Sequence, residues 1–416
     1  MAETLISPGV FLQENDLSQV QQGPISVGAA ILGPTVYGPV NKPTVVRSYS
    51  DFKAKFGALF VSGGTNYEYL TSIAALNYFE QGGDTLLVNR VVSGTFSPAT
   101  ASILSNYGYN TSSFTVETLS EGVIMNNDYN ATNGTSSLSS GSINNIRWEI
   151  SFSDTGSGLF TLVVRRGDDY QNQKIVLETW NNLSLDPNSA NFVSYVIGDQ
   201  KVTPAQDETG AYYLQYSGAY PNQSRYIRIS SVNLPTPNLY DNLGRIKSAY
   251  TSSLPKVGSG SVNGAFGGAV GNVIQDDAMS LYENIPASPI LSYLDGNIQG
   301  VVGTDYGVGI SLLSNKDQYD FKTIYAPGLN AQNSSVAVNN ILQLAQNRGT
   351  CIAVVDMTAY QQNISQATQQ AITLDSSYGA TYWPWIQLRS RETGKLFFCP
   401  ASTIVPAEYE IGRAHV

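Results

Sequence analysis

The chain has 416 residues, of which 42% are hydrophobic, so it is long enough to form two or three domains with real cores. Only 13% of its residues are charged, against a typical ~25%, and its net charge is -10. Because like charges repel, such an acidic chain is a poor partner for nucleic acid or for anionic membranes, and we expect neither as a partner.

The cysteine content indicates a reducing compartment, and the lack of a long apolar run bears on export and membrane spanning. Two cysteines, Cys351 and Cys399, are too few for a disulfide framework in a chain of this length. The N-terminal residues lack a basic stretch followed by an apolar one, and no run of about 18 apolar residues occurs. We therefore expect neither secretion by a signal peptide nor a membrane-spanning helix.

Residues 1–22 are predicted to form an extended arm. Pro8 and Gly9 indicate a turn, and the short apolar stretch from Val10 to Leu12 is followed by polar residues. Such a segment has nothing of its own to pack against, so it is expected to find a partner elsewhere.

The next segment, residues 23–95, has the pattern of a layered α/β core. The run 27–32 (VGAAIL), closed by Gly33-Pro34, predicts a strand buried on both faces, and 45–46 a further short strand. A short helix is expected over 51–56 and a longer one over 67–81, where Leu70, Ile73, Leu76 and Phe79 form an apolar stripe. The strand expected over 85–92 then completes a helical crossover of a parallel sheet.

The composition changes over residues 96–249, which are rich in Asn, Ser, Thr and Gly, and this change predicts an inserted β-rich domain. Short runs of β-forming residues recur between turn signals, as in a sandwich or meander. The expected strands are 146–152, 159–165, 174–180, 192–197 and 212–216. The glycine-rich stretch 258–271 is expected to be a return linker or surface loop, since it lacks the spacing of a phosphate-binding loop.

The α/β pattern resumes within residues 250–410, which are assigned to the same core. A strand is expected over 321–326, stopped by Pro327-Gly328, and a helix over 335–347. A buried strand over 351–355 ends in Asp356, followed by a helix over 363–374 and a strand over 380–386.

The closing segment 411–416 (IGRAHV) fits nothing before it and can be encoded by a common sequencing adapter. We expect it to be non-native, with the natural C-terminal region missing. It contains the one histidine of the chain, His415, so the rest offers no histidine for a nucleophilic triad or a metal site.

Several residues invite a functional interpretation, and for each the structural one is favoured. Asp356, at the end of a parallel strand, could serve a hydrolase, but a capping aspartate is the more common case. Arg166-Gly167-Asp168 spells a cell-adhesion tripeptide that would suit an adhesin, although three-residue matches arise often by chance. The aromatic run from Tyr382 to Trp385 is expected to pack in a core or an interface. We therefore predict no catalytic residue, no cofactor and no metal site.

Phrases in order along the chain resemble the sheath proteins of contractile phage tails and related injection machines. The opening, 7–14 (SPGVFLQE), resembles their S-P-G-V-Y-x-x-E start, and 29–43 resembles a segment with G-P landmarks. Further phrases that resemble the family are centred on Phe56-Gly57, Gly82-Gly83, Arg90, Pro327-Gly328, Asp356 and the Y-W-P-W run. The arm landmarks are Pro8, Gly9, Val10, Phe11, Leu12 and Glu14. The core or interface landmarks are Gly33, Pro34, Gly38, Pro39, Phe56, Gly57, Gly82, Gly83, Arg90, Pro327, Gly328, Asp356, Tyr382, Pro384 and Trp385.

The resemblance implies a non-enzymatic structural subunit with a subtilisin-like sheath domain. Such subunits form stacked hexameric rings around an inner tube and contract to drive the tube through a cell envelope. The implied partners are neighbouring sheath subunits, the tail tube protein, and the baseplate and tail terminator proteins. The implied location is the tail of a virion assembled in the host cytoplasm, and a bacterial injection system is the alternative within this interpretation.

Overall fold

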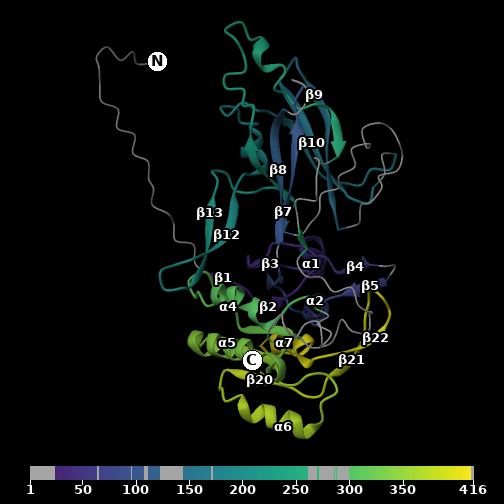
Figure 1. Ribbon diagram of the computed structural model, residues 1–416, viewed down its shortest axis with the longest axis vertical. Coiled ribbons are helices and arrows are strands. Elements are labelled where there is room, and N and C mark those ends of the chain that lie inside the picture. The colour runs from purple at the N-terminus through teal and green to yellow at the C-terminus, as the bar shows by residue number, and fades with distance from the viewer. Residues whose placement is uncertain are drawn as a thin grey trace, which may run out of the picture.

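A computed structural model describes residues 24–62, 65–94, 96–106, 111–121, 144–169, 172–260, 269–270, 285, 287 and 299–413. The arm landmarks from Pro8 to Glu14, most of the glycine-rich stretch 258–271 and His415 lie outside these residues. The described chain forms an elongated molecule with a β-rich part at one end and an α/β part at the other (Figure 1). It is thus a mixed α/β fold with several sheets. Within the described part, no helix is long and apolar enough to cross a membrane.

A six-stranded sheet forms the centre of the α/β part, which we call the core. In spatial order its strands are β20 (Gly379–Thr381), β19 (Ile352–Asp356), β18 (Thr323–Asn330), β2 (Ala29–Gly33), β6 (Leu86–Arg90) and β3 (Thr44–Val46). Neighbouring strands are parallel except β3, which is antiparallel to β6. The predicted crossover between two buried parallel strands is confirmed, because β2 pairs with β6 in parallel register.

Helices cover both faces of this sheet. On one face Ala30, Leu32 and Ile324 pack with α4 (Gly307–Leu313) and α5 (Ala331–Arg348). On the other, Ile31, Val88 and their alternating neighbours pack with α1 (Tyr49–Phe56), α2 (Leu70–Glu80) and α7 (Val405–Arg413). Because successive strand side chains point to opposite faces, strands buried on both faces appear in the sequence as unbroken apolar runs.

Helix α2 differs from its predicted orientation. Leu70 and Ile73 do pack inward, but they contact the hairpin of β21 (Ile386–Arg389) and β22 (Leu396–Cys399). The side that faces the sheet carries Ala74, Ala75 and Tyr78 instead. A helix buried on two sides has no single apolar stripe, so the spacing of large residues indicated only one of its two contacts.

The β-rich part, which we call the sandwich, consists of two four-stranded sheets. One has the order β11 (Val176–Leu183), β10 (Leu159–Arg166), β9 (Ile146–Asp154), β15 (Gly258–Gly260). The other has the order β14 (Ile227–Val232), β8 (Ser112–Glu121), β7 (Phe96–Leu104), β16 (Ala269–Val270). Their facing side chains, among them Phe114 and Phe160 with ring centroids 5.4 Å apart, share one apolar core.

Smaller elements complete the fold. The hairpin of β12 (Lys201–Gln206) and β13 (Tyr212–Ser217) extends from the sandwich toward the core (Figure 1). The hairpin of β4 (Leu59–Ser62) and β5 (Thr65–Glu68) and the parallel pair of β1 (Ile25–Ser26) and β17 (Tyr319–Asp320) belong to the core end. Helix α6 (Ile364–Thr373) follows β19, as the sequence predicts.

Three segments differ from the sequence prediction. The expected strand 192–197 is the short helix α3 (Val193–Ile197), which buries Val193 and Ile197 one turn apart in the sandwich core. Its β-branched residues favour strands, but packing overrides that preference. The expected strand 380–386 ends at Thr381, since Pro384 lacks the N–H that a continued ladder needs. The stretch 258–271, expected to be a linker or loop, contains the edge strands β15 and β16.

Candidate assembly site

The two edges of the core sheet differ in their capacity to accept another strand. At the β3 edge, Lys55 Nζ donates to the Val45 carbonyl at 2.9 Å and pairs with Asp51 at 2.9 Å. In an antiparallel pair the N–H and C=O of one residue point to the same side, so this bond occupies the outward carbonyl of β3. A lysine on an edge strand is a usual device against unwanted pairing.

The β20 edge has no such cover among the described residues. Of the described strands, β19 alone pairs with β20, and Ala353 N donates to the Tyr378 carbonyl at 2.8 Å. In a parallel ladder the pairing alternates, so Gly379 and Thr381 direct their backbone N–H and C=O groups away from β19. These groups form a short open edge that an extended segment can pair with.

Aromatic side chains of the predicted Tyr382–Trp385 run follow β20 directly. Tyr382 and Trp383 are about two-fifths exposed, and the Tyr382 hydroxyl bonds that of Tyr409 at 2.6 Å. Trp385 instead points inward, where its Nε1 donates to the Thr358 carbonyl at 3.1 Å and its ring packs on Tyr360. The run is a loop rather than part of a strand, with one side packed and the other exposed beside the open edge.

Asp356 lies buried at the end of β19 and holds neighbouring segments together. Its Oδ2 accepts from Ser402 Oγ at 2.6 Å and from Gly328 N at 3.2 Å, and its Oδ1 accepts from Ser402 N at 3.3 Å. Burial raises the pKa of Asp356 to about 6, although these hydrogen bonds act in the opposite direction. Both oxygens thus join β19 to β18 and to the 3-10 turn Ala401–Thr403, whereas the helix that follows β19 is capped by Asn363.

Three glycine landmarks, Gly38, Gly57 and Gly328, combine left-handed backbone with a close neighbour, and Gly38 and Gly328 illustrate why no other residue fits there without strain. Gly38 has φ +112°, and a Cβ atom there would lie 2.4 Å from the Phe56 ring. Gly328 has φ +87°, and its Cβ would lie 2.7 Å from Leu70. Left-handed backbone and close contact together require glycine at both positions. Of the remaining landmarks, Gly33 ends β2, Gly57 ends α1, and Gly82 and Gly83 follow α2.

Arg90, another landmark, joins the core to the sandwich. Its buried guanidinium donates through Nη1 to the Gly38 carbonyl at 2.7 Å and to the Glu121 carbonyl at 2.5 Å. Burial lowers the pKa of Arg90 to about 10, so it remains a cation at neutral pH. The side chain of Glu121 accepts from Val40 N at 2.9 Å and forms an ion pair with Lys42. The sequence contained no signal for Glu121 or Lys42, because their partners are about 80 residues away.

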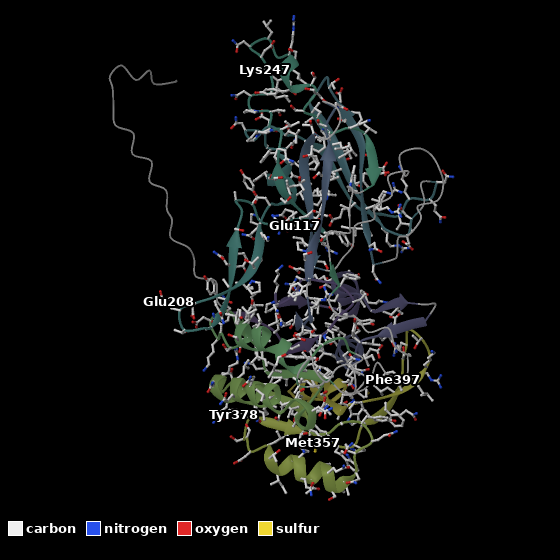
Figure 2. The ribbon with its side chains drawn as sticks, in the orientation of Figure 1. Glu117, Glu208, Lys247, Met357, Tyr378 and Phe397 are labelled. Atoms are coloured by element: carbon white, nitrogen blue, oxygen red, sulfur yellow. The ribbon has the colours of Figure 1, made fainter. Side chains whose placement is uncertain are left out.

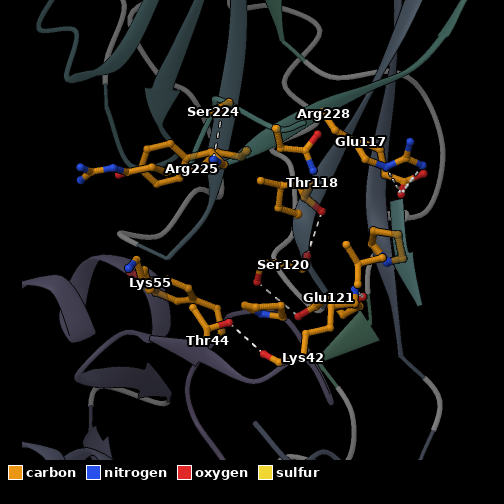
Figure 3. Close-up of a pocket in the computed structure, with 18 of the residues that line it drawn as sticks. Lys42, Thr44, Lys55, Glu117, Thr118, Ser120, Glu121, Ser224, Arg225 and Arg228 are labelled. Carbon is orange, nitrogen blue, oxygen red and sulfur yellow. Dashed lines mark hydrogen bonds and ion pairs between the residues drawn. The ribbon is translucent and has the colours of Figure 1, made fainter. Parts of the chain in front are cut away.

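A second contact connects the two parts at the β12–β13 hairpin, where Tyr212 N donates to Ser311 Oγ of α4 at 3.0 Å. Between the two contacts lies a cavity of about 610 Å³ lined by both parts, with Lys55 from the core and Arg225 from the sandwich. Figure 3 shows these side chains with Lys42, Glu117, Glu121 and Arg228. Two separate contacts restrict rotation of the sandwich on the core.

The adhesion-like tripeptide is engaged within its own turn. Arg166 Nη2 donates to Asp168 Oδ2 at 2.9 Å, and the Gly167 carbonyl accepts from Arg147 Nε at 2.9 Å. To bind a receptor on another cell, the tripeptide would first have to break its own Arg166–Asp168 ion pair. In the described part of the chain, no three His, Cys, Asp or Glu side chains lie close enough together to hold a metal ion.

Comparison with known proteins gives similarity at the level of structure only. No family model matches the chain, and no curated protein matches it. A sheath tail protein of Listeria innocua matches 95% of the chain with 11% identity and a TM-score of 0.44. A sheath tail protein of Desulfitobacterium hafniense matches 96% of it with 12% identity and a TM-score of 0.35. The chain spans 58% and 60% of the lengths of these two proteins.

Proposed function

We propose that this chain is a structural subunit of a contractile tail sheath, which forms stacked hexameric rings around an inner tube. The observation that carries the proposal is the series of sheath-like phrases, in order, from Ser7–Glu14 to Tyr382–Trp385. Gly38, Arg90, Gly328 and Asp356 from this series have specific structural roles at the end of the core sheet and its junction with the sandwich. Contraction would then drive the tube through the target envelope during delivery.

In this function the arm, residues 1–22, adds a strand to the open β20 edge of a neighbouring copy. An added strand needs free backbone groups, which Gly379 and Thr381 offer at this edge. Backbone hydrogen bonds, at about 1 kcal/mol net each, keep neighbours joined with little demand on side chains. The linked bodies can then re-dock as units when the lattice shortens.

Within the lattice, the sandwich faces outward, where its many loops can vary without changing the rings. The tail tube, baseplate and tail terminator proteins are the proposed further partners. The proposed location is the tail of a virion, and the same subunit would suit a bacterial injection system. The role is structural rather than catalytic.

Electron microscopy of the purified protein tests this function. We expect tubes or rings from the intact chain and their loss on deletion of residues 1–20. Thr381→Pro removes an outward N–H from β20 and is expected to reduce assembly in the same way. Val45→Pro is the matched control, because it removes an outward N–H from the β3 edge that Lys55 already covers. Tubes that form normally from the deletion variant would disprove the role of the arm.

A further inference from the structure

The cavity between sandwich and core is basic in an otherwise acidic chain. Its lining includes six basic residues, Lys42, Lys55, Arg166, Lys201, Arg225 and Arg228, but only two acidic ones, Glu117 and Glu121. The whole chain has the opposite balance, with 22 basic and 32 acidic residues. Its volume of about 610 Å³ is within the usual range of binding sites, roughly 300–1,000 Å³.

Some of these cations already have acidic partners. Lys42 pairs with Glu121, Lys55 with Asp51, Arg166 with Asp168 and Arg228 with Glu117. The charged groups of Lys201 and Arg225 have no ion pair or hydrogen bond with any described residue, although Arg225 N donates to Glu178 Oε1 at 2.9 Å. An adjoining hollow shares Lys55 and Arg225 with the cavity and adds Asp51, the partner of Lys55, and Arg47, which is exposed and lacks an ion pair in the described chain. We call the cavity and this hollow the basic cleft.

The end of the β12–β13 hairpin has the complementary charge. Asp207 and Glu208 are, within the described ranges, the only adjacent acidic residues that are both exposed. Asp207 Oδ1 accepts from Thr209 N at 2.8 Å and from Ala211 N at 2.9 Å, which fixes the turn. The hydrogen bond from the Thr209 hydroxyl, together with those from the backbone, holds the pKa of Asp207 below its usual value. Glu208 projects from the margin of the molecule (Figure 2).

This turn is placed to reach a second copy rather than its own cleft. The base of the hairpin, through Lys201, Val202, Leu214 and Tyr216, already forms part of the cleft wall. Its far end lies on α4 through the bond from Tyr212 N to Ser311 Oγ. A two-stranded hairpin with both of these attachments cannot fold its end back into the cleft.

We propose that the Asp207–Glu208 turn of one copy enters the basic cleft of the next copy, where Glu208 faces Lys201 and Arg225. This contact rests on the proposed function, since it is an interface of the subunit lattice. The turn and the cleft are different surfaces of one chain, so the contact is heterologous and repeats from copy to copy, producing a ring or a helical filament. The charges add directional attraction and salt dependence to the backbone link of the arm.

The test uses charge reversal at two exposed positions of the intact chain. Glu208→Lys reverses the charge of one of the two acids of the turn, and Arg225→Glu reverses that of one cation of the cleft. Each is expected to raise the dissociation constant for self-association about tenfold or more in sedimentation velocity at 50 mM salt. Asp84→Lys, at an exposed acid in the loop between α2 and β6, makes the same charge change away from the cleft and should leave association unchanged.

Mixing the two variants gives the sharper result. A Glu208→Lys copy keeps a working cleft, and an Arg225→Glu copy keeps a working turn, so the mixture should associate more strongly than either variant does alone. Urea unfolding of each variant checks that it remains folded. If the intact chain assembles but the reversals have no effect, or the mixture associates no more strongly than the separate variants, this docking is wrong while the sheath function stands. An intact chain that stays monomeric at all concentrations overturns both.

Discussion

The buried carboxyl of Asp356 makes a specific prediction about how stability depends on pH. Burial raises its pKa from 3.8 to about 6 in the folded protein. In the unfolded chain the pKa of this carboxyl keeps its ordinary value of 3.8, so protonation of Asp356 favours the folded state. The contribution is fully present below pH 3.8 and is lost as the pH rises through 6. Each pKa unit corresponds to about 1.4 kcal/mol, so the loss is about 3 kcal/mol in the free energy of unfolding.

Asp356→Asn isolates this contribution, because the amide has the size of the protonated acid but does not titrate. Urea unfolding of both proteins at intervals from pH 4 to pH 8 gives the difference between their free energies of unfolding. Other titrating groups cancel in that difference. We expect the natural protein to lose about 3 kcal/mol relative to the variant over this range.

The sign of this result distinguishes two physical effects. Loss of the charged form's hydration disfavours the carboxylate, whereas hydrogen bonds from Ser402 and Gly328 favour it. If the free energies of unfolding of the two proteins change in parallel with pH, the lost hydration and the hydrogen bonds balance. A natural protein that gains stability over its variant as pH rises would refute the reasoning, because the hydrogen bonds would then outweigh burial.

Three further changes follow from the same structure. Gly38→Ala should reduce the free energy of unfolding by about 1–3 kcal/mol, because the new Cβ combines a strained backbone with overlap with the Phe56 ring. Gly82→Ala is the control, since Gly82 also has positive φ but has open space around it, and it should cost less. Equal losses in urea unfolding would contradict the role of the overlap. Arg90→Met removes the guanidinium donor from the Gly38 and Glu121 carbonyls and should cost about 3 kcal/mol, and a loss below 1 kcal/mol would argue against this junction. Lys55→Met uncovers the β3 edge and should increase light scattering on concentration, whereas unchanged scattering would show that the lysine does not protect this edge.

Much of the core was predictable because its strands are buried on both faces. The run 27–32 and the strand ending in Asp356 contain no polar residue before the strand ends. Few structures other than a buried strand fit such a short apolar run. The helix over 331–348 was predictable for a related reason, since Val338, Ile341 and Ala345 recur at helical spacing. Strands β7 and β8 were not predicted, although Thr and Ser alternate in them with apolar residues such as Ile103, Phe114 and Val116, which is a strand pattern.

The site was predictable only in part. The landmarks Gly38, Arg90, Gly328 and Asp356 were identified from the sequence, but their roles depend on partners that lie far along the chain. Val193 to Ile197 show the same limit for an element, since a β-forming segment is a helix wherever packing favours one.

The sequence by itself determined which segments must be buried and where the backbone must turn, because burial and backbone strain act on each residue locally. Only the tertiary structure decided that one sheet edge is covered by Lys55 while the other is open, and that basic residues from distant segments line a single cleft. Electrostatic and edge effects depend on which groups meet in space, and in a chain of this length the meeting groups are often about a hundred residues apart.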